Sequence, residues 1–231
     1  MKNLRMYLLA VLAGVALSAS AQFVNSGSSG SSRLTSVTTD GWNRLYISYL
    51  PSKLKLDVNG ADDLKMKGFS IGYMRGISVT NKLPLYVEVG AAFQYRADKE
   101  DVEYSGYSLK EKINVMSLNV PFHLLYRFNV TDDFSIEPFF GFDFRLNLAG
   151  KYKLEADGGG MSASEDYSLF DDDDMYELGM DACKRFQAGW HVGVNLSYKP
   201  VYFSVHYGKD FNEINDRMKV ATTTVSLGYN F

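Results

Sequence analysis

The side chains most able to bind a ligand include an acidic run, Asp171 to Asp174, in a segment that is acidic throughout. Residues 149–181 carry ten acidic side chains and only two lysines, a net charge of −8. Carboxylate oxygens are the ligands that Ca²⁺ and Mg²⁺ prefer, so Asp171, Asp172, Asp173 and Asp174 are candidates for a divalent cation site. The segment lacks the spaced D-x-[DN]-x-[DN]-G order of a known calcium loop. The alternative is a solvated, self-repelling surface loop.

The only three histidines, His123, His191 and His206, form a second candidate group. Neutral imidazoles bind transition metals and relay protons near neutral pH. A two-residue turn at Lys199-Pro200 would place His206 opposite Gly193, diagonal to His191. The group is therefore either a metal site or proton relay, or a set of packed, hydrogen-bonded histidines.

Six charged residues fall on the polar face of their segments: Glu88, Arg96, Arg127, Glu137, Asp143 and Arg145. If Val130 pairs with Phe134 across a three-residue turn, Arg127 lies opposite Glu137, and Asn119 and Pro121 lie opposite Arg145 and Asp143. An Arg127–Glu137 pair would satisfy two buried charges or serve as the gate of a narrow channel. There is no G-x-S-x-G nucleophile elbow and Glu137 and Asp143 point inward, so we expect neither catalysis nor a cofactor.

Alternation of apolar with small or polar residues is the pattern that must position these groups, because period two indicates β-strands. Eight strands are predicted, at 42–56, 64–79, 85–96, 116–129, 134–148, 186–198, 201–208 and 220–231. Their connections alternate in length. Tight turns at 80–83, 131–133 and 199–200 fall at one end, and longer loops at 57–63, 97–111, 149–181 and 210–218 fall at the other. An even strand count with this alternation is typical of a transmembrane β-barrel.

A soluble barrel with an apolar interior is the competing architecture, and the two differ in which face meets water. The polar face of these strands is rich in glycine and carries few charges, of both signs, which suits the crowded interior of a narrow barrel. Aromatic residues gather near the short-turn ends of the apolar face, as in an interfacial girdle: Tyr126, Phe128, Phe134, Tyr198, Tyr229 and Phe231. Aromatic residues make up 14% of the chain, and a lipid-facing wall with an aromatic girdle accounts for this high content. The sequence therefore favours a membrane barrel.

The N-terminus predicts export. Basic residues Lys2 and Arg5, an apolar run at 6–17 and Ala19-Ser20-Ala21 predict a signal peptide at 1–21. Residues 22–40 are rich in Ser, Gly and Thr and predict a flexible periplasmic leader, so the barrel domain would span 41–231. No basic stripe stands out, which argues against nucleic acid as a partner. Cys183 is the only cysteine, so no intramolecular disulfide can form.

The signal peptide, the eight strands and the final Leu227-Gly228-Tyr229-Asn230-Phe231 resemble a Gram-negative outer-membrane barrel, similar to the PorT-like outer membrane protein beta-barrel domain family and to OmpX-like and OmpA-like barrels in size. The resemblance implies an all-β, eight-stranded antiparallel up-and-down barrel in the cell outer membrane, with both termini periplasmic. It implies outer-membrane lipid and lipopolysaccharide as surroundings. The barrel-assembly machinery would read Leu227, Tyr229 and Phe231.

The expected function is a structural or interaction role that presents acidic extracellular loops, with a protein as a possible partner of those loops. The alternative is a narrow channel or transporter, or an accessory component of a protein secretion system.

Overall fold

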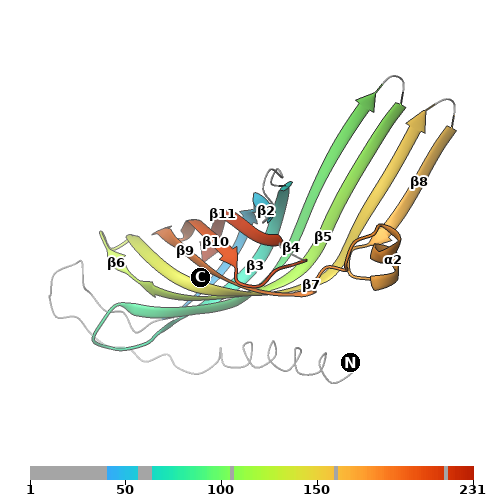
Figure 1. Ribbon diagram of the computed structural model, residues 1–231. Helices are drawn as coiled ribbons and strands as arrows, with labels where there is room; N and C mark the ends of the chain where they lie inside the picture. Colours follow the sequence, from blue (N-terminus) through green and yellow to red (C-terminus); the bar gives the residue numbers. More distant parts are fainter. Residues whose placement is uncertain (1–40, 57–63, 105–106, 159–160, 216–217) are drawn as a thin grey trace. The chain divides into compact units, whose positions relative to one another are not determined.

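Strands make up most of the described chain (Figure 1). The structure is a computed structural model and describes residues 41–56, 64–104, 107–158, 161–215 and 218–231. The predicted signal peptide at 1–21 and leader at 22–40 lie outside the described residues, as does the predicted loop at 57–63. In the described part of the chain, no helix is long and apolar enough to cross a membrane.

The strands follow one another as an antiparallel series with one short helix. Their bounds are β1 Trp42–Tyr49, β2 Ser52–Leu56, β3 Leu64–Ser78, β4 Leu85–Tyr104, β5 Tyr107–Tyr126, β6 Phe128–Asn129, β7 Phe134–Gly158, β8 Met161–Ser168, β9 Phe186–Tyr198, β10 Val201–Asp210 and β11 Met218–Asn230. The helix α2, Asp172–Glu177, lies between β8 and β9.

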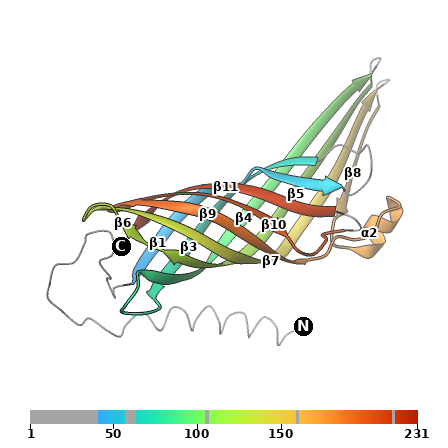
Figure 2. The same ribbon diagram turned by 60° about the vertical axis from the view of Figure 1, so that its left-hand side comes forward.

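The sheet closes on itself. Neighbours run β1-β11-β10-β9-β7-β5-β4-β3, and β1 pairs with both β3 and β11. β2 also pairs with β3 and β11. β1 and β2 are therefore two halves of one barrel strand, which is interrupted at Leu50-Pro51. Figure 2 shows the resulting ring of strands. The eight-stranded antiparallel barrel predicted from the alternation is confirmed. Its eight strands are β1 with β2, β3, β4, β5, β7, β9, β10 and β11; each pairs with the next in this series, and β11 returns to β1.

The tight turns set the strand register as the sequence predicts. Phe128 lies opposite Ile136, and the same register continues to Asn119 opposite Arg145 and Pro121 opposite Asp143. The turn at Lys199-Pro200 places Val201 opposite Tyr198 and His206 opposite Gly193.

The two faces of the barrel wall have opposite character. The outward face is apolar, with exposed Leu45, Ile71, Phe93, Phe140, Val192, Phe203 and Leu227 among its members. The inward face holds buried Ser, Asn, Gln, His and charged side chains together with Tyr46, Tyr86 and Tyr202. Glycines make room for these rings, and a Cβ on Gly72 would come within 2.5 Å of the Tyr46 ring.

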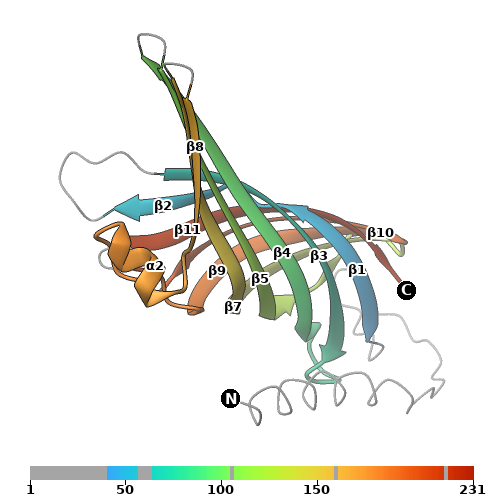
Figure 3. The same ribbon diagram turned by 90° about the vertical axis from the view of Figure 1, so that its right-hand side faces the viewer.

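Two of the predicted long loops are wrong. Residues 97–104 and 107–115 continue β4 and β5, and residues 149–158 continue β7 and pair with β8. These strands rise beyond the barrel as two hairpins (Figures 1 and 3). Both faces of this sheet carry charged residues, so the contrast between an apolar and a polar face that marks the barrel strands is weaker there.

Candidate functional site

A charged cluster crosses the barrel interior close to the short-turn end, and Arg44 is its centre. Arg44 Nη1 lies 2.5 Å from Glu88 Oε1, and Nη2 lies 3.3 Å from Glu137 Oε2. All three side chains have 0% exposure. β1, β4 and β7 contribute one residue each, so the ion pairs of the cluster connect three strands across the barrel interior.

Both carboxylates of the cluster are fully engaged. Glu88 also accepts a hydrogen bond from Trp42 Nε1 at 2.7 Å and lies 3.1 Å from His123 Nδ1. Glu137 lies 2.8 Å from Arg127 Nη2, the pair expected from the turn register. Ser135 Oγ donates to Glu137 at 3.0 Å. With two arginines and two carboxylates the cluster is neutral, and its partners are satisfied as buried charges require.

Aromatic rings pack over the two arginines. The Arg44 guanidinium carbon lies 3.6 Å from the centre of the Tyr202 ring, and that of Arg127 lies 3.8 Å from the Trp42 ring. Trp42 in turn packs on Tyr86, with ring centres 4.8 Å apart. Cation–π contacts of this kind are strongest where water is excluded, so the rings add to the packing of the buried charged cluster.

Gly76 is the position on which the Trp42 packing depends. A Cβ at Gly76 would lie 2.2 Å from Trp42 Cε2, so Gly76→Ala should force the indole away from Glu88 and Arg127. We expect a loss of about 1–3 kcal/mol in the free energy of unfolding, typical of an overpacked core. Urea unfolding in lipid vesicles measures it. Ile77→Val, at an exposed position of the same strand, is the control, and equal midpoints for the two variants would contradict this packing.

A second charged cluster lies farther along the barrel interior. Arg145 forms an ion pair with Asp210. Asp143 accepts a hydrogen bond from Asn119 Nδ2 at 2.7 Å and lies 2.6 Å from His191 Nδ1. Arg96, only 5% exposed, donates to Ser52 Oγ at 3.1 Å and has no carboxylate within ion-pair distance among the described residues. All six predicted charged residues therefore face the interior, divided between two clusters.

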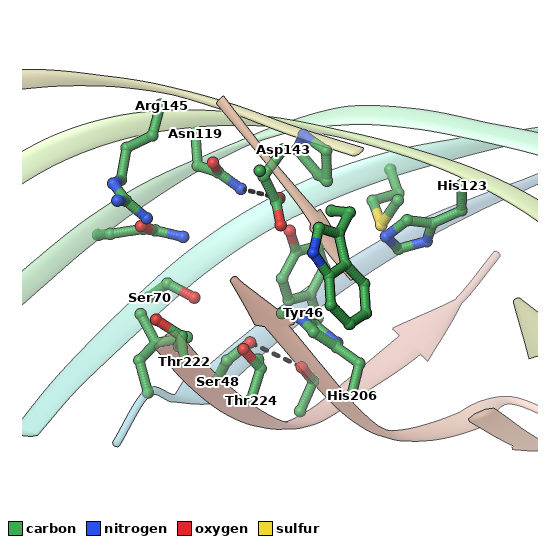
Figure 4. Close-up of a pocket in the computed structure, with 18 of the residues that line it drawn as sticks. Tyr46, Ser48, Ser70, Asn119, His123, Asp143, Arg145, His206, Thr222 and Thr224 are labelled. Carbon is green, nitrogen blue, oxygen red and sulfur yellow. Dashed lines mark hydrogen bonds between the residues drawn. The ribbon is translucent and has the colours of Figure 1, made fainter. Parts of the chain in front are cut away.

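A small cavity lies in the same interior, beside two of the three histidines (Figure 4). The cavity has a volume of about 50 Å³, enough for a few water molecules. His123 and His206 line it, and the rings of His123 and His191 have centres 4.7 Å apart. His123 also stacks on Phe139 at 4.4 Å. In the described ranges, no group of three or more His, Cys, Asp or Glu side chains is arranged to hold a metal ion.

The acidic run lies outside the barrel wall, at helix α2. The Asp171 side chain caps the helix by accepting from the backbone N–H groups of Asp173 and Asp174. Asp174 Oδ2 accepts from Ser168 N at 2.7 Å. Asp172 and Asp173 occupy the first turn, where negative charge interacts favourably with the helix dipole. The run therefore has a structural role at a helix start.

The last strand carries the predicted assembly residues on its outward face. Leu227, Tyr229 and Phe231 are all more than half exposed. Phe231 exchanges two backbone hydrogen bonds with Asn43, each of 2.9 Å. The C-terminal residue thus helps to close the barrel where β11 meets β1.

Sequence reasoning missed three interior residues of these clusters: Trp42, Arg44 and Asp210. Arg44 is the most important, and its strand showed the least regular alternation. The alternation that places Arg44 in the interior can be read in the sequence of β1. The inward residues are Trp42, Arg44, Tyr46 and Ser48, and the outward residues between and after them are Asn43, Leu45, Ile47 and Tyr49.

Comparison with known families identifies the class of protein that this barrel represents. The family model for the outer membrane protein beta-barrel domain matches residues 7–231. The chain belongs to that family and is an outer-membrane β-barrel protein. No curated protein sequence matches the chain.

Three solved structures are similar to this chain over nearly their whole length. The attachment invasion locus protein Ail of Yersinia pestis is 17% identical, with a TM-score of 0.40, and the match covers 83% of this chain and 99% of Ail. Neisserial surface protein A is 14% identical, with a TM-score of 0.38 and coverage of 82% and 97%. The N-terminal barrel domain of Pseudomonas aeruginosa OprF is 12% identical, with a TM-score of 0.36 and coverage of 83% and 100%.

Proposed function

We propose that this barrel is a closed structural and interaction protein of the outer membrane, with no catalytic role. The observation that carries the proposal is the neutral cluster of Arg44, Glu88, Glu137 and Arg127, packed by Trp42, Tyr86 and Tyr202. Its ion pairs join opposite sides of the barrel interior and leave no unpaired charge within the cluster itself. Eight strands also leave an interior that side chains can fill.

The orientation in the membrane follows from the same proposal. Residues 1–21 direct export, residues 22–40 remain in the periplasm, and the tight turns lie on the periplasmic side with both termini. The barrel-assembly machinery recognises Leu227, Tyr229 and Phe231 during insertion. The hairpins of β4, β5, β7 and β8 then stand outside the cell, next to lipopolysaccharide, where they are free to contact a protein.

Planar-bilayer recording tests whether the interior is closed. We expect the purified barrel to give no persistent conductance at up to about 100 mV, a voltage that supplies only about 2.3 kcal/mol per unit charge to disrupt buried pairs. Arg44→Ala combined with Arg127→Ala removes both bridging cations and should increase the frequency of openings. Persistent openings of the unmodified protein would contradict the proposal and favour the narrow channel. Copurification with a secretion complex would instead favour an accessory role.

A further inference from the structure

The hairpins that rise from the barrel form a four-stranded sheet whose two faces differ in charge. The order is β4-β5-β7-β8, and register places each residue on one face. We call inner the face that continues the barrel interior, through Arg96 of β4 and Val115 of β5. We call outer the face that continues the membrane-facing wall, through Tyr95 and Met116.

All lysines of this sheet lie on the outer face, where they are mixed with acids. The lysines are Lys99, Lys110, Lys112, Lys151 and Lys153, and the acids are Asp101, Glu103, Glu155, Asp157 and Asp166. Lys99 lies 2.6 Å from Asp101, and Lys112 lies 2.8 Å from Glu155. Hydrogen bonds from Lys112 and Lys153 lower the pKa of Glu155 to about 2. The outer face is therefore neutral and largely paired within itself.

Beyond Arg96, the inner face of the rising sheet carries four acids and no base: Asp98, Glu100, Glu111 and Glu165. None of the four forms an ion pair with the described residues, in contrast to the outer face. Glu100 and Glu111 are directly opposite each other on neighbouring strands, an arrangement that destabilises a sheet. The hydroxyls of Tyr152 and Tyr167 hydrogen-bond Glu111 and Glu165, but no described residue supplies a positive charge to the pair Glu100 and Glu111. A like-charge pair left without a counter-charge is typical of a functional surface.

Apolar side chains lie among these acids. Leu109 is 39% exposed, and Ile113 and Leu154 occupy neighbouring inner positions on β5 and β7. Ala156 and Ala163 extend the row across β7 and β8 and are exposed. A sheet with an apolar face normally packs another layer against it. Among the described elements, helix α2 contacts β8 near Tyr167, and Leu109, Ala156 and Ala163 are left exposed.

We propose that this inner face binds a short basic polypeptide segment in which apolar residues alternate with lysine or arginine. Positive charge in the partner would complement Asp98, Glu100, Glu111 and Glu165, and its apolar residues would cover Leu109, Ile113 and Leu154. Three inner rows on four strands make a face of roughly 300 Å². A standard interface between folded proteins buries about 800 Å² on each partner, so the face fits a segment and not a whole domain.

The inference rests on the proposed function and deepens it, and a peptide titration tests it. The barrel is placed in nanodiscs of zwitterionic lipid. A labelled nonapeptide of alternating lysine and valine is titrated by fluorescence anisotropy, with empty nanodiscs as background. We expect saturable binding that weakens as salt rises, because partly exposed charges are screened. The same peptide with glutamate in place of lysine should not bind.

Two quadruple variants with the same net charge locate the site. Asp98→Asn, Glu100→Gln, Glu111→Gln and Glu165→Gln neutralise the inner face, and Asp101→Asn, Glu103→Gln, Asp157→Asn and Asp166→Asn neutralise as many outer acids. We expect the inner variant to raise the dissociation constant about tenfold or more and the outer variant less than about twofold. Circular dichroism and the gel shift of the folded barrel verify that both variants fold.

Several results would overturn the docking site. Equal weakening by the two variants would mean that only the overall charge attracts the peptide. Absence of binding by the unmodified barrel would reject the site directly. Association of two barrels through this face in analytical ultracentrifugation, lost in the inner variant, would identify a second copy as the occupant. A conducting barrel would contradict the proposed function, whereas a silent barrel that ignores the peptide contradicts only the docking site.

Discussion

Arg44→Met is expected to lower the free energy of unfolding of the barrel by about 3–5 kcal/mol, the range for breaking a buried ion pair by removing one partner. Methionine fills much of the volume but carries no charge. Glu88 and Glu137, both fully buried, would lose their shared cation. Arg127 and His123 remain, but each contacts the other oxygen of its carboxylate, so neither replaces Arg44 at Glu88 Oε1 and Glu137 Oε2. The loss should therefore exceed that of an ordinary hydrogen bond.

Reversible urea unfolding in lipid vesicles, followed by tryptophan fluorescence, measures this loss. Arg75→Met is the matched control, because Arg75 is half-buried and donates to Asn43 Oδ1 at 2.7 Å without an ion pair among the described residues. Its loss should be about 1.5 kcal/mol, the lower end of the range for a hydrogen bond that involves a charged group. Adding Glu88→Gln to Arg44→Met should recover part of the stability, because Glu137 keeps its ion pair with Arg127 and no buried carboxylate is left without a cation. Similar losses for Arg44→Met and Arg75→Met would contradict the central role of Arg44.

The strands and their register could be predicted because they depend on local patterns. Alternation assigns a face to each residue, and a tight turn fixes which residue lies opposite which. The pairing of Arg127 with Glu137 follows from the turn at 131–133 alone. The position of His206 opposite Gly193 follows in the same way from Lys199-Pro200.

Contacts across the interior could not be predicted, because they depend on closure of the whole ring. Arg44 reaches Glu88 on β4 and Glu137 on β7, and neither strand pairs with β1. No turn connects these residues, so sequence spacing contains no information about their distance. Asp210 was missed for a different reason: the strand was predicted to end at residue 208, and β10 ends at Asp210 in the structure.

The rising sheet was missed because its strands lack the strong contrast between faces that the membrane imposes. In the barrel, one face meets lipid and the other meets packed polar groups. Beyond the membrane, both faces of β4, β5, β7 and β8 meet water, and charged residues occur on each. The segregation of lysines onto one face becomes visible only when the register of all four strands is known.

Phe140→Arg is expected to cost about 2–4 kcal/mol in lipid, the range for arginine at the midplane of a transmembrane barrel. Phe140 is 47% exposed on the outward face of β7. It lies between Leu124 and Val192 on the neighbouring strands, so no polar group of the wall can receive the guanidinium. An arginine there must be desolvated or must distort the bilayer around it.

Tyr198→Arg is the control, because it distinguishes the effect of depth in the membrane from the effect of removing an aromatic ring. Tyr198 is also exposed and outward, but it lies at the tight turn beside Val201 and opposite Phe134. Arginine near the interface should cost about 0–1 kcal/mol, because its charged end reaches the headgroups. Urea unfolding in vesicles compares the two variants. Equal costs would mean that Phe140 does not lie at the membrane midplane, since in a uniform solvent the two exposed positions would respond alike.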